Sequence, residues 1–223
     1  MFARIAACAA LSLVAVQAAA VTGPQAAEPG PAIYAAHCAS CHGADLKGGP
    51  GVPDLTDAHW RLGGADEENY RMQPSDVEAI VRHGIRSGDP KAHGASVMPG
   101  WAEPGRPTAS LSAADLDDTV AYVVQLTGGA TDAQQAQRGR ALFNGRAACF
   151  DCHASDAKGD NSIGATDLTR PSVWLYGHSA DAIRKSIVEG RGAVMPGFAG
   201  VLSADEVREV SAYVHGKASG YDF

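Results

Sequence analysis

Cysteine and methionine are scarce in this sequence, which contains five Cys and four Met residues. Long apolar runs are absent after residue 21, so no later segment is expected to cross a bilayer. The 26 Gly and 12 Pro residues argue against long helix bundles and favour short helices joined by ordered loops. The positions of the few Cys and Met residues are therefore informative.

The N-terminus has the pattern of a secretory signal. Arg4 supplies an early positive charge, residues 5–21 contain no charged residue, and Ala18-Ala19-Ala20 offers a cleavage site, with Ala27 as a weaker second choice. We expect residues 1-27 to be a signal peptide that exports the chain to the periplasm. An uncleaved membrane anchor is the alternative, because 17 weakly apolar residues lie at the short edge of a membrane span.

Four of the five Cys residues stand in two copies of the motif C-x-x-C-H, at residues 38–42 and 149–153. In a helix, residues at i, i+3 and i+4 share one face, so both sulfurs and the imidazole would point the same way. Two thiols adding to the vinyl groups of a haem, with the next residue offering a ring nitrogen to iron, is the chemistry this spacing serves. We expect two covalently bound haem c groups, held by Cys38, Cys41 and His42 and by Cys149, Cys152 and His153.

Two other interpretations of these Cys pairs remain open. A thioredoxin-like redox pair uses C-x-x-C, but it needs neither the following His nor a second copy. A zinc site would gather four ligands from the two pairs and leave the His residues over. The fifth Cys, Cys8, lies in the predicted signal peptide, so the motifs account for every Cys of the mature chain.

The sequence contains a tandem repeat of one unit. Cys38 and Cys149 are 111 positions apart, which indicates two units of about 100 residues each. Gly30 and Tyr34 precede the first motif at the spacing with which Gly139 and Phe143 precede the second. We expect an all-α fold of two tandem cytochrome c domains, 28-128 and 129-223, each wrapping one haem.

Helix signals repeat in the same order in both halves. A short helix is predicted to begin at Ser75 or Ser179, and an apolar helix with a capping box to begin at Ser112 or Ser203. The residues at 87–95, between the short helix and the next Met, have almost no counterpart in the second half.

Two of the four Met residues stand in the same place in each half, as Met98-Pro99-Gly100 and Met195-Pro196-Gly197. A following Pro favours extended backbone at the Met, which suits a loop that lays a thioether over a haem. We expect Met98 and Met195 to be iron ligands, with His83, His93 and Met72 as alternatives to Met98.

The run from Gly30 to Val214 resembles the tandem di-haem region of the third subunit of cbb3-type cytochrome c oxidases, within the class I cytochrome c superfamily. The resemblance rests on the two C-x-x-C-H motifs, the two Met-Pro-Gly sequences, Pro53-Asp54-Leu55-Thr56 and Trp174-Leu175-Tyr176-Gly177. It implies that His42 pairs with Met98 and His153 with Met195 at the two irons. Thr166 stands where that family usually has Pro; its carbonyl would still accept from the His153 ring.

These features predict a periplasmic di-haem c-type cytochrome that transfers single electrons and is not itself an enzyme. The expected partners are a terminal oxidase or periplasmic dehydrogenase and a small cytochrome or cupredoxin, with no nucleic acid. Membrane contact is expected only through a partner or an uncleaved anchor. The alternative is a haem enzyme, peroxidase-like or thiosulfate-oxidising, but this needs an open iron or a Cys ligand, whereas both halves offer a Met.

Acidic charge is concentrated in the first half of the chain. Residues 28–127 hold 7 Lys and Arg against 14 Asp and Glu, whereas residues 128–223 hold 10 against 11. Asp115, Asp117 and Asp118 crowd together in the first half. We therefore expect a basic partner to dock chiefly through the first domain.

Overall fold

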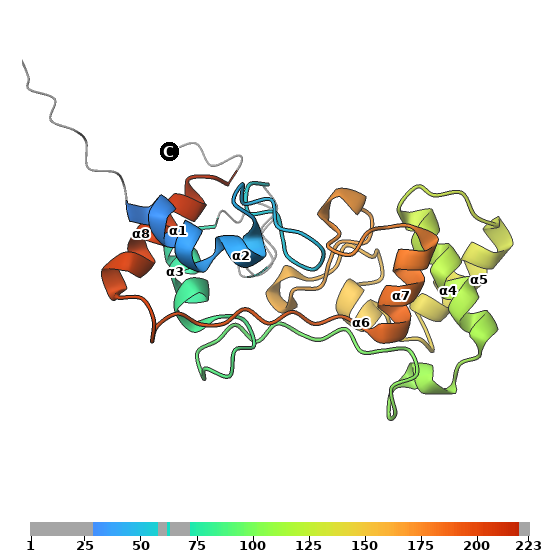
Figure 1. The fold of residues 1–223 in the computed structure, drawn as a ribbon. Coiled ribbons are helices and arrows are strands. Elements are labelled where there is room, and N and C mark those ends of the chain that lie inside the picture. Colours follow the sequence, from blue (N-terminus) through green and yellow to red (C-terminus); the bar gives the residue numbers. More distant parts are fainter. Residues whose placement is uncertain (1–28, 58–61, 63–71, 219–223) are drawn as a thin grey trace, which may run out of the picture.

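The computed structural model describes residues 29–57, 62 and 72–218, in which helices form two lobes joined by two extended segments (Figure 1). In this part of the chain, β-pairing is limited to isolated bridges, so the all-α expectation is confirmed. None of the described helices has the length and apolar character that a membrane crossing needs. The predicted signal peptide, residues 1-27, lies outside the described residues. The helices are α1 Pro29–His37, α2 Ala39–His42, α3 Pro74–His83, α4 Ala113–Leu126, α5 Ala133–Phe143, α6 Phe150–His153, α7 Ala180–Glu189 and α8 Ala204–His215.

Most helix starts follow the predicted caps. The side chains of Ser112, Ser179 and Ser203 accept a backbone hydrogen bond at the starts of α4, α7 and α8. The start of α3 was predicted wrongly, because this helix begins at Pro74 and not after Ser75. Asp76 accepts from the backbone N–H of Gln73 at 2.7 Å, and Pro suits the first helical position, so the cap lies two residues earlier.

The helices do not pack repeat by repeat. Helices α1 and α3 pack against α8, and with α2 they form what we call the terminal lobe. Helix α4 packs against α5 and α7, and with α6 these form the central lobe. The boundary expected between domains 28-128 and 129-223 falls in the turn between α4 and α5, inside the central lobe. The proposed domains therefore describe sequence repeats, whereas each hydrophobic core draws on both repeats.

Two glycines explain the closest helix contacts. A Cβ on Gly139 of α5 would lie 1.9 Å from the carbonyl oxygen of Asp118 in α4. A Cβ on Gly30 of α1 would lie 2.6 Å from the carbonyl oxygen of Glu209 in α8. The aromatic residue four positions on makes an edge contact in each pair, Phe143 with Tyr122 at 5.3 Å and Tyr34 with Tyr213 at 5.6 Å. The repeated Gly and aromatic pattern thus marks a helix crossing between the two repeats.

Salt bridges also bind α4 to the second repeat. Asp118 forms a bidentate pair with Arg138 at 2.7 and 2.9 Å, and Asp115 lies 3.3 Å from Arg146. Asp117 pairs with Arg184 of α7. The acidic cluster expected to dock a basic partner through the first domain is therefore occupied by arginines of the central lobe, and it is not a free docking surface.

Residues 84–98 and 190–195 connect the lobes and run side by side (Figure 1). They pair in antiparallel fashion through bridges between Ile85 and Met195 and between Met98 and Arg191. The extra residues of the first repeat form a side loop, closed by hydrogen bonds from Arg86 N–H to His93 and from His93 N–H to Gly84, each 3.0 Å. Both predicted Met ligands therefore lie on these connecting segments.

Candidate haem sites

The two C-x-x-C-H motifs form matching helical turns, one in each lobe. The N–H of His42 donates to the carbonyl of Cys38, and that of His153 to Cys149, both at 3.0 Å. All four thiols are free of disulfides. Cys38 packs against the terminal core and Cys149 against the central core. Because the Cys pairs lie in different lobes, they do not assemble the four-ligand zinc site considered above.

Each haem-motif histidine keeps one ring nitrogen for a ligand. The Nδ1 of His153 lies 3.1 Å from the carbonyl of Thr166, so a proton on Nδ1 leaves Nε2 as the donor to iron. The predicted role of the Thr166 carbonyl is thus realised without Pro. The Nδ1 of His42 is buried and lacks a hydrogen bond of good geometry. The Pro53 carbonyl is still close enough to raise the pKa of His42. Burial lowers the pKa of both histidines, and this effect exceeds the opposing effect of the backbone carbonyls. The lowered pKa favours the neutral ring, which can bind a metal.

Burial also shapes the chemistry of the cysteines. It raises the pKa of the Cys149 thiol to about 12, and it raises the pKa of Cys38, with a further contribution from Cys41. Cys38 and Cys149 thus lie beside apolar cores, which fits thioether attachment to a large apolar cofactor.

The loop after each motif has the same conformation in both lobes. The N–H of Gly48 donates to the His42 carbonyl at 2.9 Å, and that of Gly159 to the His153 carbonyl at 3.0 Å. Both glycines have positive φ, 67° and 78°, and a Cβ on either would lie within 2.4 Å of a carbonyl oxygen. These turns bring the carbonyls of Pro53 and Thr166 under their histidine rings.

Each of the two predicted Met ligands lies in the lobe that holds the haem motif of the other repeat. Met195 packs against the terminal core, which contains Cys38, and Met98 packs against the central core, which contains Cys149. The pairing implied by the family resemblance, within each repeat, is therefore not the one the structure shows. The reason is that the connecting segments cross between lobes before they reach each Met.

The alternative ligands are placed as follows. His83 is engaged with Asp89 at 3.0 Å, and the buried Nδ1 of His93 has no hydrogen-bond partner among the described residues. Met72 is 2% exposed and belongs to the same core as Met195. Met195 and Met98 occupy equivalent positions in the paired connecting segments, whereas Met72 has no such counterpart, so Met195 is the better candidate.

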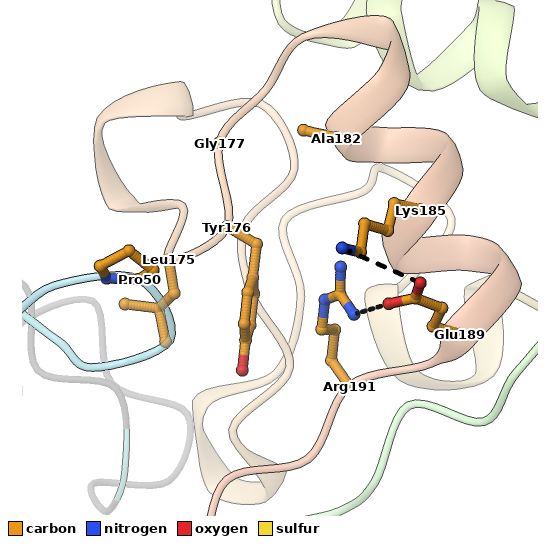
Figure 2. A pocket seen from close by; sticks show the side chains of 8 residues that line it. All are labelled: Pro50, Leu175, Tyr176, Gly177, Ala182, Lys185, Glu189 and Arg191. Atoms are coloured by element: carbon orange, nitrogen blue, oxygen red, sulfur yellow. Dashed lines mark hydrogen bonds and ion pairs between the residues drawn. The ribbon is translucent and has the colours of Figure 1, made fainter.

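A group of residues that we did not predict lies beside Met98. A cavity of about 590 Å³ is lined by the Tyr176 ring, Lys185, Glu189 and Arg191, together with Pro50 of the other lobe (Figure 2). The Arg191 guanidinium lies over the Tyr176 ring, 4.4 Å from its centroid. The sequence did contain a sign of this difference between the repeats. Arg191 directly follows Gly190, the glycine that ends α7, whereas Ile85 stands at the same place after Gly84 in the first repeat.

Comparisons with known proteins match both halves of the chain to cytochrome families. The family described as Cytochrome c matches residues 27–127, and the family described as Cytochrome C oxidase, cbb3-type, subunit III matches residues 134–214. The cbb3-type cytochrome c oxidase subunit CcoP of Rhodobacter capsulatus is 35% identical over 199 residues, covering 86% of this chain and 62% of the relative. Subunit FixP of Azorhizobium caulinodans is 33% identical over 192 residues, with coverage of 86% and 59%. Subunit FixPc of Rhizobium leguminosarum bv. viciae is 35% identical over 192 residues, with coverage of 86% and 61%.

The chain spans about three fifths of the length of these curated relatives. Over that length, both halves match cytochrome families, and both have the same backbone hydrogen bonds within and after the C-x-x-C-H motif. The chain is accordingly a di-haem class I cytochrome c with two covalently bound haem c groups, similar to the tandem haem region of the third subunit of cbb3-type oxidases.

Proposed function

We propose that the protein carries single electrons in the periplasm between a donor and an acceptor, without substrate chemistry of its own. Each haem, when bound, supplies a one-electron iron couple. The relatives are subunits of cbb3-type oxidases, which supports a terminal oxidase as the acceptor, and a small cytochrome or cupredoxin would suit as donor. Membrane association would come through such a partner or through the N-terminal segment.

The observation that carries this proposal is that one attachment Cys and one Met pack against each core, Cys38 with Met195 and Cys149 with Met98. We assign His42 with Met195 to the terminal lobe and His153 with Met98 to the central lobe. A haem held by an imidazole and a thioether would have no position for a substrate, which disfavours the peroxidase-like and thiosulfate-oxidising alternatives.

The chain's own residues keep the sites in a fixed arrangement. The Thr166 carbonyl orients the His153 ring, and Phe143 packs 6.5 Å from it, between ring centroids. The lobes are joined by hydrogen bonds from Gly51 N–H to the Leu175 carbonyl, 3.1 Å, and from Ser96 N–H to the Ile163 carbonyl, 2.9 Å. A fixed arrangement of the two sites would suit electron transfer, because little has to reorganise.

The ligand assignment can be tested in a variant that keeps one haem, with Cys38 and Cys41 replaced by Ser. The remaining haem, on Cys149 and Cys152, should show the weak near-infrared sulfur-to-iron band in its oxidised state. M98A should abolish that band and let carbon monoxide bind the reduced iron, whereas M195A should preserve it. The opposite result would restore ligation within each repeat, and carbon monoxide binding to the unsubstituted protein would refute the proposed function.

A further inference from the structure

The two axial Met residues have unequal neighbours at equivalent positions. Met98 exchanges two backbone hydrogen bonds with Arg191, both 2.8 Å. Met195 exchanges the same two bonds with Ile85, at 3.0 and 2.9 Å. Arg191 and Ile85 each follow the glycine that ends a helix, α7 or α3. A permanently positive side chain thus stands beside one Met and an uncharged side chain beside the other.

The Arg191 guanidinium is held in place on several sides. It lies 4.4 Å over the Tyr176 ring, and a terminal nitrogen lies 3.1 Å from Glu189 (Figure 2). Its Nε also donates to Ser186 Oγ at 3.2 Å. The Arg191 side chain is 20% exposed, whereas Glu189 is 51% exposed. Lys185 lies 4.0 Å from Glu189, so the cluster holds two positive charges and one negative charge.

We propose that Arg191 raises the reduction potential of the haem attached at Cys149 and Cys152 above the value it would have without this charge. A fixed positive charge favours the reduced iron, which carries one positive charge less. Its partial burial limits screening by water and salt. The terminal haem lacks this contribution, since Ile85 stands at the equivalent place. This charge would make the central haem easier to reduce than it would otherwise be, with no bond or proton involved. The inference rests on the proposed electron-transfer function and on ligation of the central haem by Met98.

The test uses the complete di-haem protein in a redox titration. M98H identifies the central-lobe wave, because a second imidazole should lower the potential of that haem alone. R191Q and E189Q break the same ion pair, so any purely structural effect of losing it should be similar in both. An electrostatic effect has opposite signs. We expect R191Q to lower the reduction potential of the central-lobe haem by ~59 mV, which is about a tenfold change in the ratio of reduced to oxidised haem for a one-electron couple. E189Q should raise this potential by a smaller amount.

Two further variants serve as controls. R184Q removes another arginine of α7, paired with Asp117 at the surface, and should leave both waves unchanged. K185Q should lower the central wave by less than R191Q, because Lys185 is 65% exposed. Arg86, which lies 3.4 Å from the Ala193 carbonyl on the connecting segments, is kept in every variant.

Shifts of the same sign in R191Q and E189Q, or a central wave that neither moves, would overturn the inference. The near-infrared band separates this from failure of the proposed function, since an intact band with unmoved waves refutes the role of Arg191 alone. If R191Q loses part of the band, the decision passes to E189Q, where a raised central wave supports the inference and an unmoved or lowered one overturns it.

Discussion

Replacing Gly139 with Ala should destabilise the central lobe, because this glycine lets α5 cross α4 in backbone contact. A Cβ would lie 1.9 Å from the Asp118 carbonyl oxygen and 2.9 Å from the Cβ of Tyr122. An ordinary contact of this kind begins near 3.4 Å, so the helices would have to separate by roughly 1.5 Å at this point. The neighbour is backbone, which cannot rotate away as a side chain can.

The size of the effect follows from two opposing contributions. Ala is favoured over Gly in a helix interior by about 0.5–1 kcal/mol. Forcing extra volume into a packed contact costs about 1–3 kcal/mol, and a backbone clash this close belongs at the upper end. We therefore expect G139A to lower the free energy of unfolding by about 2 kcal/mol. G30A, with a clearance of 2.6 Å at the α1 and α8 crossing, should cost less.

Denaturant unfolding followed at the near-infrared band would measure both variants. G139A should weaken the signal that depends on Met98, and G30A the signal that depends on Met195. Gly200 has open space around it, so G200A is the matched control and should be neutral. In what we call crossed packing, α4 of the first repeat packs with α5 and α7, and α8 of the second repeat packs with α1 and α3. This arrangement would be refuted if G139A loosened the Met195 site and left the Met98 site intact, since α5 would then pack in another lobe.

Three further predictions follow from the salt bridges, caps and connecting loop. Hydrogen bonds from Ser112 and Ser203 lower the pKa of Asp115 and Glu206, so their contribution to stability is present above about pH 4.5, the ordinary range of a carboxyl, and is lost as pH falls through the depressed values. D115N and E206Q should each flatten the acid limb of a pH-stability curve, and a limb as steep as in the unsubstituted protein would contradict this. Neutralising Asp115, Asp117 and Asp118 together should lower the melting temperature of the central lobe more than it changes the salt dependence of electron transfer, as stopped-flow and thermal unfolding would show; a large kinetic effect with no loss of stability would refute it. Shortening the side loop by deleting residues 88–92 should leave both near-infrared bands in place, because Arg86 and His93 close that loop at its base.

Local features of the fold could be predicted from the sequence because they depend on neighbouring residues. Ser112, Ser179 and Ser203 cap their helices as expected, and the two C-x-x-C-H segments are helical. The start of α3 was missed because Gln73 is not among the common capping residues. The start of α3 is fixed by the hydrogen bond that the Gln73 N–H donates to the Asp76 carboxylate.

The choice of helix partners could not be predicted in the same way. Helices α4 and α8 both present Val residues at helical spacing, and α1 and α5 both present a Gly and an aromatic residue, so either pairing satisfies the apolar pattern. What distinguishes them is contact between residues far apart in the sequence, such as Asp118 with Arg138, and the path of the connecting segments. The sequence thus singled out both Met residues as candidate ligands, but the lobe in which each one lies depends on these distant contacts.

Crossed packing has a consequence for how the two sites depend on each other. The central lobe is built from one continuous stretch, which begins at Met98 and ends at Arg191, whereas the terminal lobe combines α1, α2 and α3 with α8 from the other end of the described chain. The attachment residue Cys38 therefore shares its core with residues of α8 and with Met195, its candidate partner in holding a haem. Met98 pairs with Arg191 and Met195 with Ile85 along the same two connecting segments. We therefore expect a substitution inside one core to act on one Met site, whereas a displacement of the paired segments reaches both Met residues.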